Sequence, residues 1–291
     1  MSRPRPADAP AVTPQLLRDW PLPTIAEGGD KHDRGTVLIA GGADSTPGAV
    51  LLGGLAALRV GAGRLQLATV SATAVGLAVA APEAMVVGLP AGPSGSLGVA
   101  AADRIVELAA SARTLVLGPG LLDKDEAAEL LAAVLPRLDC PTVVLDALAL
   151  TSLAGQPSLL GGRDGVVLTP NEGELAALRG DEQTGLAATA EVASRYGAVV
   201  ATRGWVVTPD GQAWSDQAGG VGLGTSGSGD VLAGIVGGLL ARGAEPAQAA
   251  VWGQYAHAAA GDRLAGRLGR LGFLARELLD ELPAVLTSLA V

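Results

Sequence analysis

The sequence contains few of the residues that build disulfide frameworks and zinc sites. Cys140 is the one cysteine among the 291 residues, and there are two histidines. A single cysteine excludes a disulfide framework and is typical of a reducing compartment, so we expect a cytoplasmic location. Two histidines and one cysteine cannot supply the ligands of a usual zinc site. Because Cys140 lies just before an apolar segment, we interpret it as a core residue and not as a nucleophile.

Long hydrophobic runs and an excess of positive charge are also absent. Glu83, Asp230 and several prolines interrupt the most apolar stretches, so none reaches the length of a membrane-spanning helix. The 29 acidic residues outnumber the 20 basic ones, and this net charge of −9 argues against nucleic acid as a partner. The start of the chain is rich in proline and lacks the apolar segment of a signal peptide. We expect a loosely packed lead-in over 1–23, one domain over 24–291, and no membrane partner.

The sequence is rich in short apolar segments that alternate with helical ones. Apolar residues make up 49% of the chain, which is enough for a large core. Continuous apolar runs bounded by glycine are typical of parallel strands buried on both faces, and the segment near 205–215 indicates a hairpin. The pattern predicts an α/β fold of three layers, with a mostly parallel central sheet and helices on both faces. Strands are expected at 36–40, 65–70, 84–89, 114–117, 142–145, 166–168, 198–201, 205–208 and 212–215, and helices at 49–60, 100–110, 125–135, 184–196, 231–241, 246–264 and 273–289.

The stretch G-T-S-G-S-G-D, from Gly224 to Asp230, precedes one of these helices and is called the anion hole below. The start of a helix presents free N–H groups and the positive end of a dipole, and glycine lets a ligand approach the backbone closely. This combination favours phosphate binding. Asp230 would repel the anion, so it is better suited to take a proton from a group being phosphorylated, or to act beside a metal ion. The alternative is that Asp230 only caps the helix.

Other polar or glycine-rich loops follow the expected strands where each one ends. Ligands of parallel sheets bind at the carboxyl ends of the strands, where such loops converge. The loop that begins with Gly41-Gly42 lacks the Lys-Ser/Thr ending of a Walker site, which excludes that kind of phosphate site. We therefore expect one shared site at this edge of the sheet. Its loops are Gly41-Gly42, Gly118-Pro119-Gly120, Asp146, Asn171 to Glu174, Arg203-Gly204 and Gly227 to Asp230.

The anion hole and several other motifs resemble those of one known family. The run from Gly41 to Gly63 contains P-G-A and ends in G-A-G, and it is followed by L-V-L-G-P-G-L, V-V-L-D-A-L-A-L, L-T-P-N-E-G-E-L and Q-Y-A-H-A-A-A-G-D. In this order they resemble the ADP-dependent NAD(P)H-hydrate dehydratases, which belong to the ribokinase-like superfamily, over about residues 31–283. The resemblance implies a ribokinase-like fold and a lyase that repairs nicotinamide nucleotides. Such an enzyme converts (S)-NADHX and NADPHX to NADH and NADPH with ADP as co-substrate.

The resemblance also implies roles for individual residues. Asp230 would be the catalytic carboxylate and would contact the hydrated nucleotide, as would Ala49, Gly120 and Asn171. Glu174 would act through water on Mg²⁺, because a carboxylate beside phosphate needs a divalent cation to relieve the repulsion. A homo-oligomer, in particular a tetramer, is expected as well. The nucleotide side of the site would comprise Arg203, Gly204, Gly227, Ser228 and Gly229.

Departures from the family pattern leave other functions open. Leu148 stands where the family has an aspartate, Asn171-Glu172 stands where His-Pro is usual, and the segment T-R-G-W-V-V is shorter than its counterpart. The first two features also fit a ribokinase-like kinase for a hydroxymethylpyrimidine, a thiazole or a sugar. A catalytically silent nucleotide-binding regulator is a third hypothesis, and the intact anion hole argues against it.

The remaining polar and aromatic residues of note have ordinary structural interpretations. We expect His257 to be a packed or surface-facing histidine inside its helix, and Asp262 to end that helix. Trp205, Trp214 and Trp252 are expected to anchor the core or the hairpin.

Overall fold

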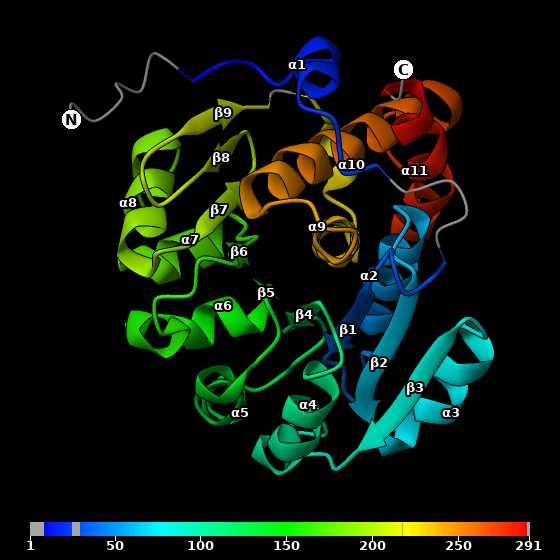
Figure 1. The fold of residues 1–291 in the computed structure, drawn as a ribbon, viewed down its shortest axis with the longest axis vertical. Helices are drawn as coiled ribbons and strands as arrows, with labels where there is room; N and C mark the ends of the chain where they lie inside the picture. Colours follow the sequence, from blue (N-terminus) through cyan, green and yellow to red (C-terminus); the bar gives the residue numbers. More distant parts are fainter. Residues whose placement is uncertain (1–8, 25–29, 217, 290–291) are drawn as a thin grey trace.

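The computed structural model describes residues 9–24, 30–216 and 218–289. A nine-stranded sheet runs through them in the order β3-β2-β1-β4-β5-β6-β7-β8-β9 (Figure 1). The first seven strands are parallel, and β8 and β9 add an antiparallel hairpin at one edge. The expected mostly parallel sheet with its hairpin is therefore confirmed. The strands are β1 (Thr36–Ala40), β2 (Arg64–Val70), β3 (Ala84–Leu89), β4 (Thr114–Leu117), β5 (Thr142–Leu145), β6 (Val166–Leu168), β7 (Val199–Thr202), β8 (Trp205–Val207) and β9 (Ala213–Ser215).

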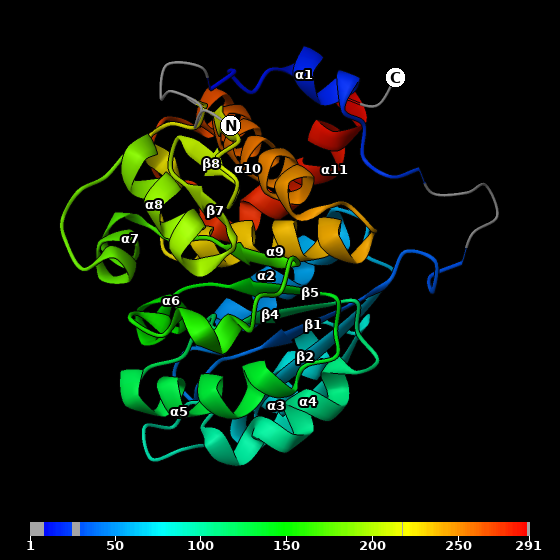
Figure 2. The same cartoon turned by 60° about the vertical axis from the view of Figure 1, so that its left-hand side comes forward.

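Helices cover both faces of the sheet, as Figures 1 and 2 show. Successive side chains of a strand point to opposite faces, so Val37 and Ile39 join one core and Leu38 and Ala40 join the other. Within the described ranges, no helix is long and apolar enough to cross a bilayer. The three-layer architecture is confirmed. One face carries α1 (Pro14–Asp19), α2 (Pro47–Arg59), α3 (Ser71–Ala80), α9 (Ser228–Ala241), α10 (Pro246–Leu268) and α11 (Ala275–Leu289), and the other carries α4 (Ala102–Ala109), α5 (Lys124–Val134), α6 (Leu148–Leu153), α7 (Glu172–Arg179) and α8 (Leu186–Tyr196).

Four helices were not expected from the sequence: α1, α3, α6 and α7. The residues of α3 carry no charge, and its Val75 and Val79 are exposed, so no polar face marks the side turned to solvent. In α6 and α7 the helix is short and begins in a loop that was assigned to the site. Conversely, α10 continues to Leu268, so the expectation that Asp262 ends its helix is wrong.

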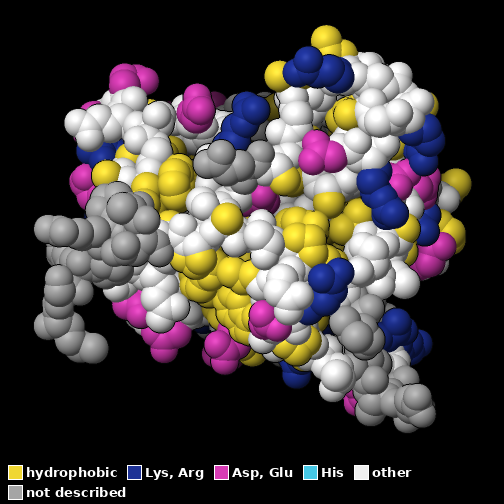
Figure 3. Space-filling view, turned by 90° about the horizontal axis from the view of Figure 1, so that it is seen from above, with side chains coloured by type: hydrophobic (Ala, Val, Ile, Leu, Met, Phe, Trp, Pro, Cys, Tyr) yellow, Lys and Arg dark blue, Asp and Glu magenta, His cyan; other side chains and the backbone are white. Residues whose placement is uncertain are grey.

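The segment before β1 packs on the domain, contrary to the loosely packed lead-in that we expected. Leu17 of α1 is fully buried in the core that also contains α9 and α10. The Trp20 ring stacks on Trp214 of β9 at 5.5 Å between centroids, and Trp252 Nε1 donates to the Trp20 carbonyl at 2.9 Å. Figure 3 shows this face from above, with hydrophobic side chains gathered at its centre. The prediction of a loosely packed lead-in is thus wrong for residues 9–22, while residues 1–8 lie outside the described residues.

Glycines bring α2 and α9 into backbone contact. A Cβ atom on Gly238 would lie 2.6 Å from the Ala57 carbonyl oxygen, and a Cβ atom on Gly234 would overlap the carbonyl of Gly53. Only residues without a side chain permit such a close approach. Gly53 meets Gly234 and Ala57 meets Gly238, so the two helices run in the same direction and their N-termini lie at the same edge of the sheet.

Candidate active site

The sheet order places a ligand-binding crevice between β1 and β4. The chain leaves β1 toward β2 on one side, and later continues from β4 toward β5 on the other, which makes this point the topological switch point. The loops after the two strands are joined there, because Gly42 N–H donates to the Pro119 carbonyl at 2.7 Å and Thr46 Oγ1 donates to the Gly120 carbonyl at 2.7 Å. A Cβ atom on Gly120 would lie 3.1 Å from that of Ala49. Two expected substrate contacts therefore adjoin each other at the crevice.

The anion hole opens at the same edge, at the N-terminus of α9. Gly227 is the N-cap residue, with φ of 87°, and a side chain there would press on Leu52 of α2. Ser228, Gly229 and Asp230 form the first turn, so the interpretation of Asp230 as the N-cap is wrong. A Cβ atom on Gly229 would meet nothing within 4 Å. No protein atom therefore blocks that side of the Gly229 backbone, and a phosphate group can approach the first turn of the helix there.

Three carboxyl groups at this edge interact electrostatically, and one of them, Asp230, belongs to the anion hole. Burial raises the pKa of Asp230 to about 6, and the negative charge of Glu174 adds to this shift. Burial likewise raises the pKa of Glu174. Asp146, which follows β5, is buried and has a pKa well above its ordinary value because of burial and the charges of Glu174 and Asp230, although Thr169 Oγ1 donates to it at 2.7 Å. The sequence placed Asp146 at this edge, but we assigned it no role.

The residue after Asp146 has an unusual backbone. Ala147 has φ of 53° and ψ of −130°, and in the described ranges it is the one residue other than glycine with a positive φ. A non-glycine residue held there costs roughly 1–3 kcal/mol, and such strain gathers at functional sites. The adjacent Asp146 carbonyl packs where a side chain on Gly118 would stand. The structure therefore keeps strain directly beside the carboxyl cluster.

Asn171 and Glu174 form a capping box at the start of α7. Glu174 N–H donates to Asn171 Oδ1 at 3.0 Å, and Asn171 N–H donates to Glu174 Oε2 at 2.9 Å. This reciprocal pair fixes the Glu174 carboxylate and leaves its Oε1 atom for another partner. No group of three or more His, Cys, Asp or Glu side chains able to hold a metal occurs among the described residues. A cation bound here would need further ligands from phosphate or water.

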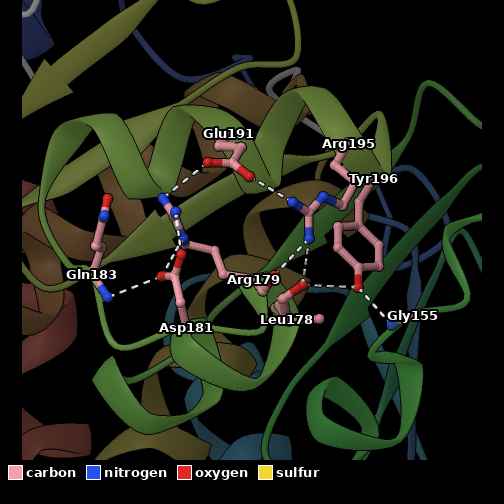
Figure 4. A network of polar contacts seen from close by, with 8 residues as sticks. All are labelled: Gly155, Leu178, Arg179, Asp181, Gln183, Glu191, Arg195 and Tyr196. Atoms are coloured by element: carbon pink, nitrogen blue, oxygen red, sulfur yellow. Dashed lines mark hydrogen bonds and ion pairs between the residues drawn. The ribbon is translucent and has the colours of Figure 1, made fainter.

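The other end of α7 is fixed by a polar network, shown in Figure 4. Arg179 is almost buried and pairs with Asp181 at 2.7 Å and with Glu191 of α8 at 3.0 Å. The Tyr196 hydroxyl donates to the Leu178 carbonyl at 3.2 Å, which ties α8 to α7 once more. The helix that presents Glu174 is thus held at both ends.

The expected nucleotide side lies farther along the same edge. Arg203 and Gly204 form the turn between β7 and β8 and line a pocket of about 220 Å³. The Gly204 carbonyl accepts from Asp216 N–H at 3.0 Å, which connects the turn to the chain that leads to the anion hole. The remaining lining residues are Trp205, Asp216, Ala218 and Gly219.

Helix α10 contacts the residues of the expected nucleotide side at three points. Gln254 Nε2 donates to the Thr202 carbonyl at 2.7 Å, and Asp262 Oδ2 accepts from Gly219 N–H at 3.3 Å. Between them, His257 Nε2 lies 2.9 Å from Ser228 Oγ in the anion hole. Burial lowers the pKa of His257 to about 4. His257 is half-buried in its helix, in line with the expected structural role, but it also contacts the expected nucleotide site, which was not foreseen.

A family model described as NAD(P)H-hydrate dehydratase matches residues 37–284. The chain belongs to this family. Over 96% of both chains, the protein is 46% identical to the ADP-dependent (S)-NAD(P)H-hydrate dehydratase of Xanthomonas campestris. It is 39% identical to the bifunctional NAD(P)H-hydrate repair enzyme of Moorella thermoacetica, with 92% of this chain and 52% of the relative covered, and so spans about half the length of that relative.

Solved structures agree with this membership. The ADP/ATP-dependent NAD(P)H-hydrate dehydratase of Bacillus subtilis, co-crystallised with ATP and Mg²⁺, matches with a TM-score of 0.81 and 28% identity over 97% of this chain and 99% of that one. A hydroxyethylthiazole kinase from Pyrococcus horikoshii matches with a TM-score of 0.56 and 19% identity, covering 87% and 89%, and shares only the fold. The expected ribokinase-like fold and the expected family of enzymes are confirmed.

The structure gathers most of the expected site residues along one edge of the sheet. Ala49 and Gly120 adjoin at the switch point, Asp230 lies within the electrostatic range of Glu174, and Asn171 caps α7 with its side chain. Their assigned roles in binding and catalysis remain predictions, as do those of the nucleotide-side residues. Sequence reasoning gave no role to Asp146, Thr169 or His257, because each is identified only by the partner it meets in space.

Proposed function

We propose that this protein dehydrates (S)-NADHX and NADPHX to NADH and NADPH in a reaction that consumes ADP. The observation that carries the proposal is the position of Asp230, a half-buried carboxyl with a raised pKa in the first turn of α9, within the field of Glu174. A base at that place can meet a hydroxyl group and the phosphate that it attacks. The relative from Xanthomonas campestris, named for this activity, gives further support.

In the proposed reaction, the hydroxyl oxygen on the hydrated ring attacks the terminal phosphorus of ADP. Asp230 takes the hydroxyl proton while the bond to AMP breaks, and the first turn of α9 holds the phosphate oxygens. The phosphate then leaves the ring carbon and a neighbouring carbon loses a proton, which restores the ring double bond. The switch-point loops with Ala49 and Gly120 would hold the hydrated nicotinamide against Asp230.

The carboxyl groups at this edge can attract Mg²⁺, although among the described residues they do not form a complete ligand set, so phosphate and water would have to supply the remaining ligands. The charge of Glu174 helps to raise the pKa of Asp230, and the charges of both help to raise that of Asp146. Carboxylate oxygens are ligands that a hard cation prefers. When bound, the cation would neutralise phosphate charge beside these groups. Glu174 would hold it through water and Asp230 would lie next to it. The Bacillus subtilis relative crystallised with ATP and Mg²⁺ supports this assignment.

We further propose a cytoplasmic homo-oligomer, a tetramer. The single cysteine supports the location. The charge-free helix α3 supports self-association, because Val75 and Val79 are about three-quarters exposed or more. Two copies that each carry a net charge of −9 can meet there without placing acidic side chains face to face.

The test follows the near-ultraviolet absorbance of the dihydronicotinamide ring. NADH hydrate lacks the conjugated ring, so dehydration restores the absorbance band and a simple kinase leaves it flat. With ADP and Mg²⁺ we expect the band to grow and AMP and phosphate to form in equal amounts. A flat trace with both ADP and ATP, together with phosphorylation of a vitamin precursor or a sugar, would replace the proposal by a kinase function.

A further inference from the structure

We propose that His257 is a positioning residue for phosphate binding: its Nε2–H group donates to Ser228 Oγ and so directs the Ser228 hydroxyl hydrogen toward the bound phosphate. The proposal rests on the proposed function in one respect, namely that a nucleotide phosphate occupies the first turn of α9. It concerns a pair of residues 29 positions apart in the chain, joined at 2.9 Å.

The hydroxyl of Ser228 is the one part of this residue that can still turn. The residue is 3% exposed, and its backbone N–H already donates to the Thr225 carbonyl at 3.2 Å. A serine hydroxyl carries a single hydrogen and two lone pairs. The hydroxyl uses either its hydrogen or a lone pair in the contact with His257. The other is then left to face a phosphate bound at the first turn of α9.

The tautomer of His257 decides whether Ser228 presents its lone pairs or its hydroxyl hydrogen to the phosphate. With a pKa of about 4, its ring is neutral at neutral pH and carries one N–H. If the hydrogen is on Nδ1, Nε2 accepts the serine hydrogen and the serine lone pairs face the phosphate, which is repulsive. If the hydrogen is on Nε2, Ser228 accepts from the ring and its own hydrogen is free for the phosphate, as a charge-assisted bond. A bound anion therefore selects the Nε2–H form.

The helix around His257 is anchored to the same site by two other side chains. On the same helix α10, Gln254 holds the turn that ends β7 and Asp262 holds Gly219. A Cβ atom on Gly219 would lie 3.3 Å from Ala258 Cβ, so the loop lies directly on the helix beside His257. The stretch of α10 that carries His257 is thus held against the nucleotide side of the site on both sides of the ring.

The chain is well suited to a direct test, because His32 is the one other histidine and lies exposed before β1. Long-range ¹⁵N–¹H spectra of histidine-labelled protein distinguish the two neutral tautomers, and a His32→Gln variant assigns the signals. We expect the Nε2–H form at pH 7, with a further change of the Nε2 signal when ADP is added. An Nδ1–H form in the ADP complex overturns the proposal.

Calorimetric titration with ADP adds a second readout that needs no dehydratase activity. Loss of a hydrogen bond corresponds to about tenfold weaker binding, so we expect His257→Leu to show that loss, and His257→Gln, whose amide can donate, to stay within about threefold. In Ser228→Ala the histidine change should have no further effect. The inference would be overturned if the leucine and glutamine variants lost equal ADP affinity and if these losses added to that of Ser228→Ala. If His257→Leu does not fold, the glutamine variant and the spectra still decide. Intact ADP binding without dehydration would instead refute only the proposed function.

Discussion

Gly53 of α2 lies against the backbone of Asp230 in α9, where a Cβ atom on the glycine would stand 3.2 Å from the Asp230 carbonyl oxygen. One turn later, a Cβ atom on Gly234 would overlap the Gly53 carbonyl. No side chain separates the two helices at this crossing. The position of the proposed base therefore depends on two backbones in direct contact, and a single methyl group can move it.

We expect Gly234→Ala to lower the free energy of unfolding by about 1–3 kcal/mol, the usual cost of overpacking, and to reduce turnover as well. Gly266→Ala on α10 is the matched control, because Gly266 is an exposed helical glycine with no atom within 4 Å of its Cβ position. The control should gain about 0.5–1 kcal/mol. Urea unfolding measures both variants, and equal midpoints would contradict the backbone contact.

We expect Asp230→Asn to reduce turnover by roughly a hundredfold or more, as for loss of a positioned general base. The amide fits the same space, so ADP affinity should be nearly unchanged by calorimetry. Folding should be at least as stable at neutral pH, because the raised pKa means that the charged carboxylate opposes folding there. A variant that kept more than half of the wild-type turnover would make Asp230 a structural residue.

Activity should fall as the pH drops below about 6, because Asp230 must be ionised to accept a proton. The same raised pKa stabilises the fold fully below about pH 4, and this contribution is lost as the pH rises through about 6. Since Glu174 helps to raise the Asp230 pKa, Glu174→Gln should shift the acid limb of kcat/KM to lower pH. Glutamine can keep the capping box, so an unchanged limb in a folded variant would show that the two carboxyls do not interact.

We expect Gly229→Val to weaken ADP binding at least tenfold while the protein remains folded, because a side chain would stand between the phosphate and the backbone N–H groups. The space around Gly229 is open, so the fold itself meets no clash. Gly266→Val on α10 is the control for helix propensity, since Gly266 is also exposed and open. Equal ADP affinities in the two variants would remove the anion hole from the proposed site.

Light scattering at micromolar concentration should give the mass of a tetramer. If α3 takes part in the contact, Val79→Glu should reduce the mass, because it places charge on a helix that otherwise has none. Glu83→Gln, a change at an exposed residue just beyond the helix, serves as a control of unchanged size. A monomer mass for the wild-type protein would end the proposal of self-association.

The centre of the sheet was predictable because strands such as β1 and β4 are buried on both faces. A segment such as Thr36–Ala40 is then continuously apolar and ends at glycine, so its bounds can be read from the sequence. Helix α3 escaped prediction because its exposed side is as apolar as its buried side. The bond between Ser228 and His257 could not be foreseen at all, since nothing in either local pattern indicates which side chain lies opposite.

Helix α10 has a practical consequence for redesign. Within three turns, from Gln254 to Asp262, it contacts the β7–β8 turn, the first residue of α9 and the loop at Gly219. A loop transplanted from another nucleotide-binding protein would lose these three supports unless the matching stretch of α10 came with it. A change of nucleotide preference is therefore best attempted by exchanging the β7–β8 turn, the loop at Gly219 and residues 254–262 of α10 together.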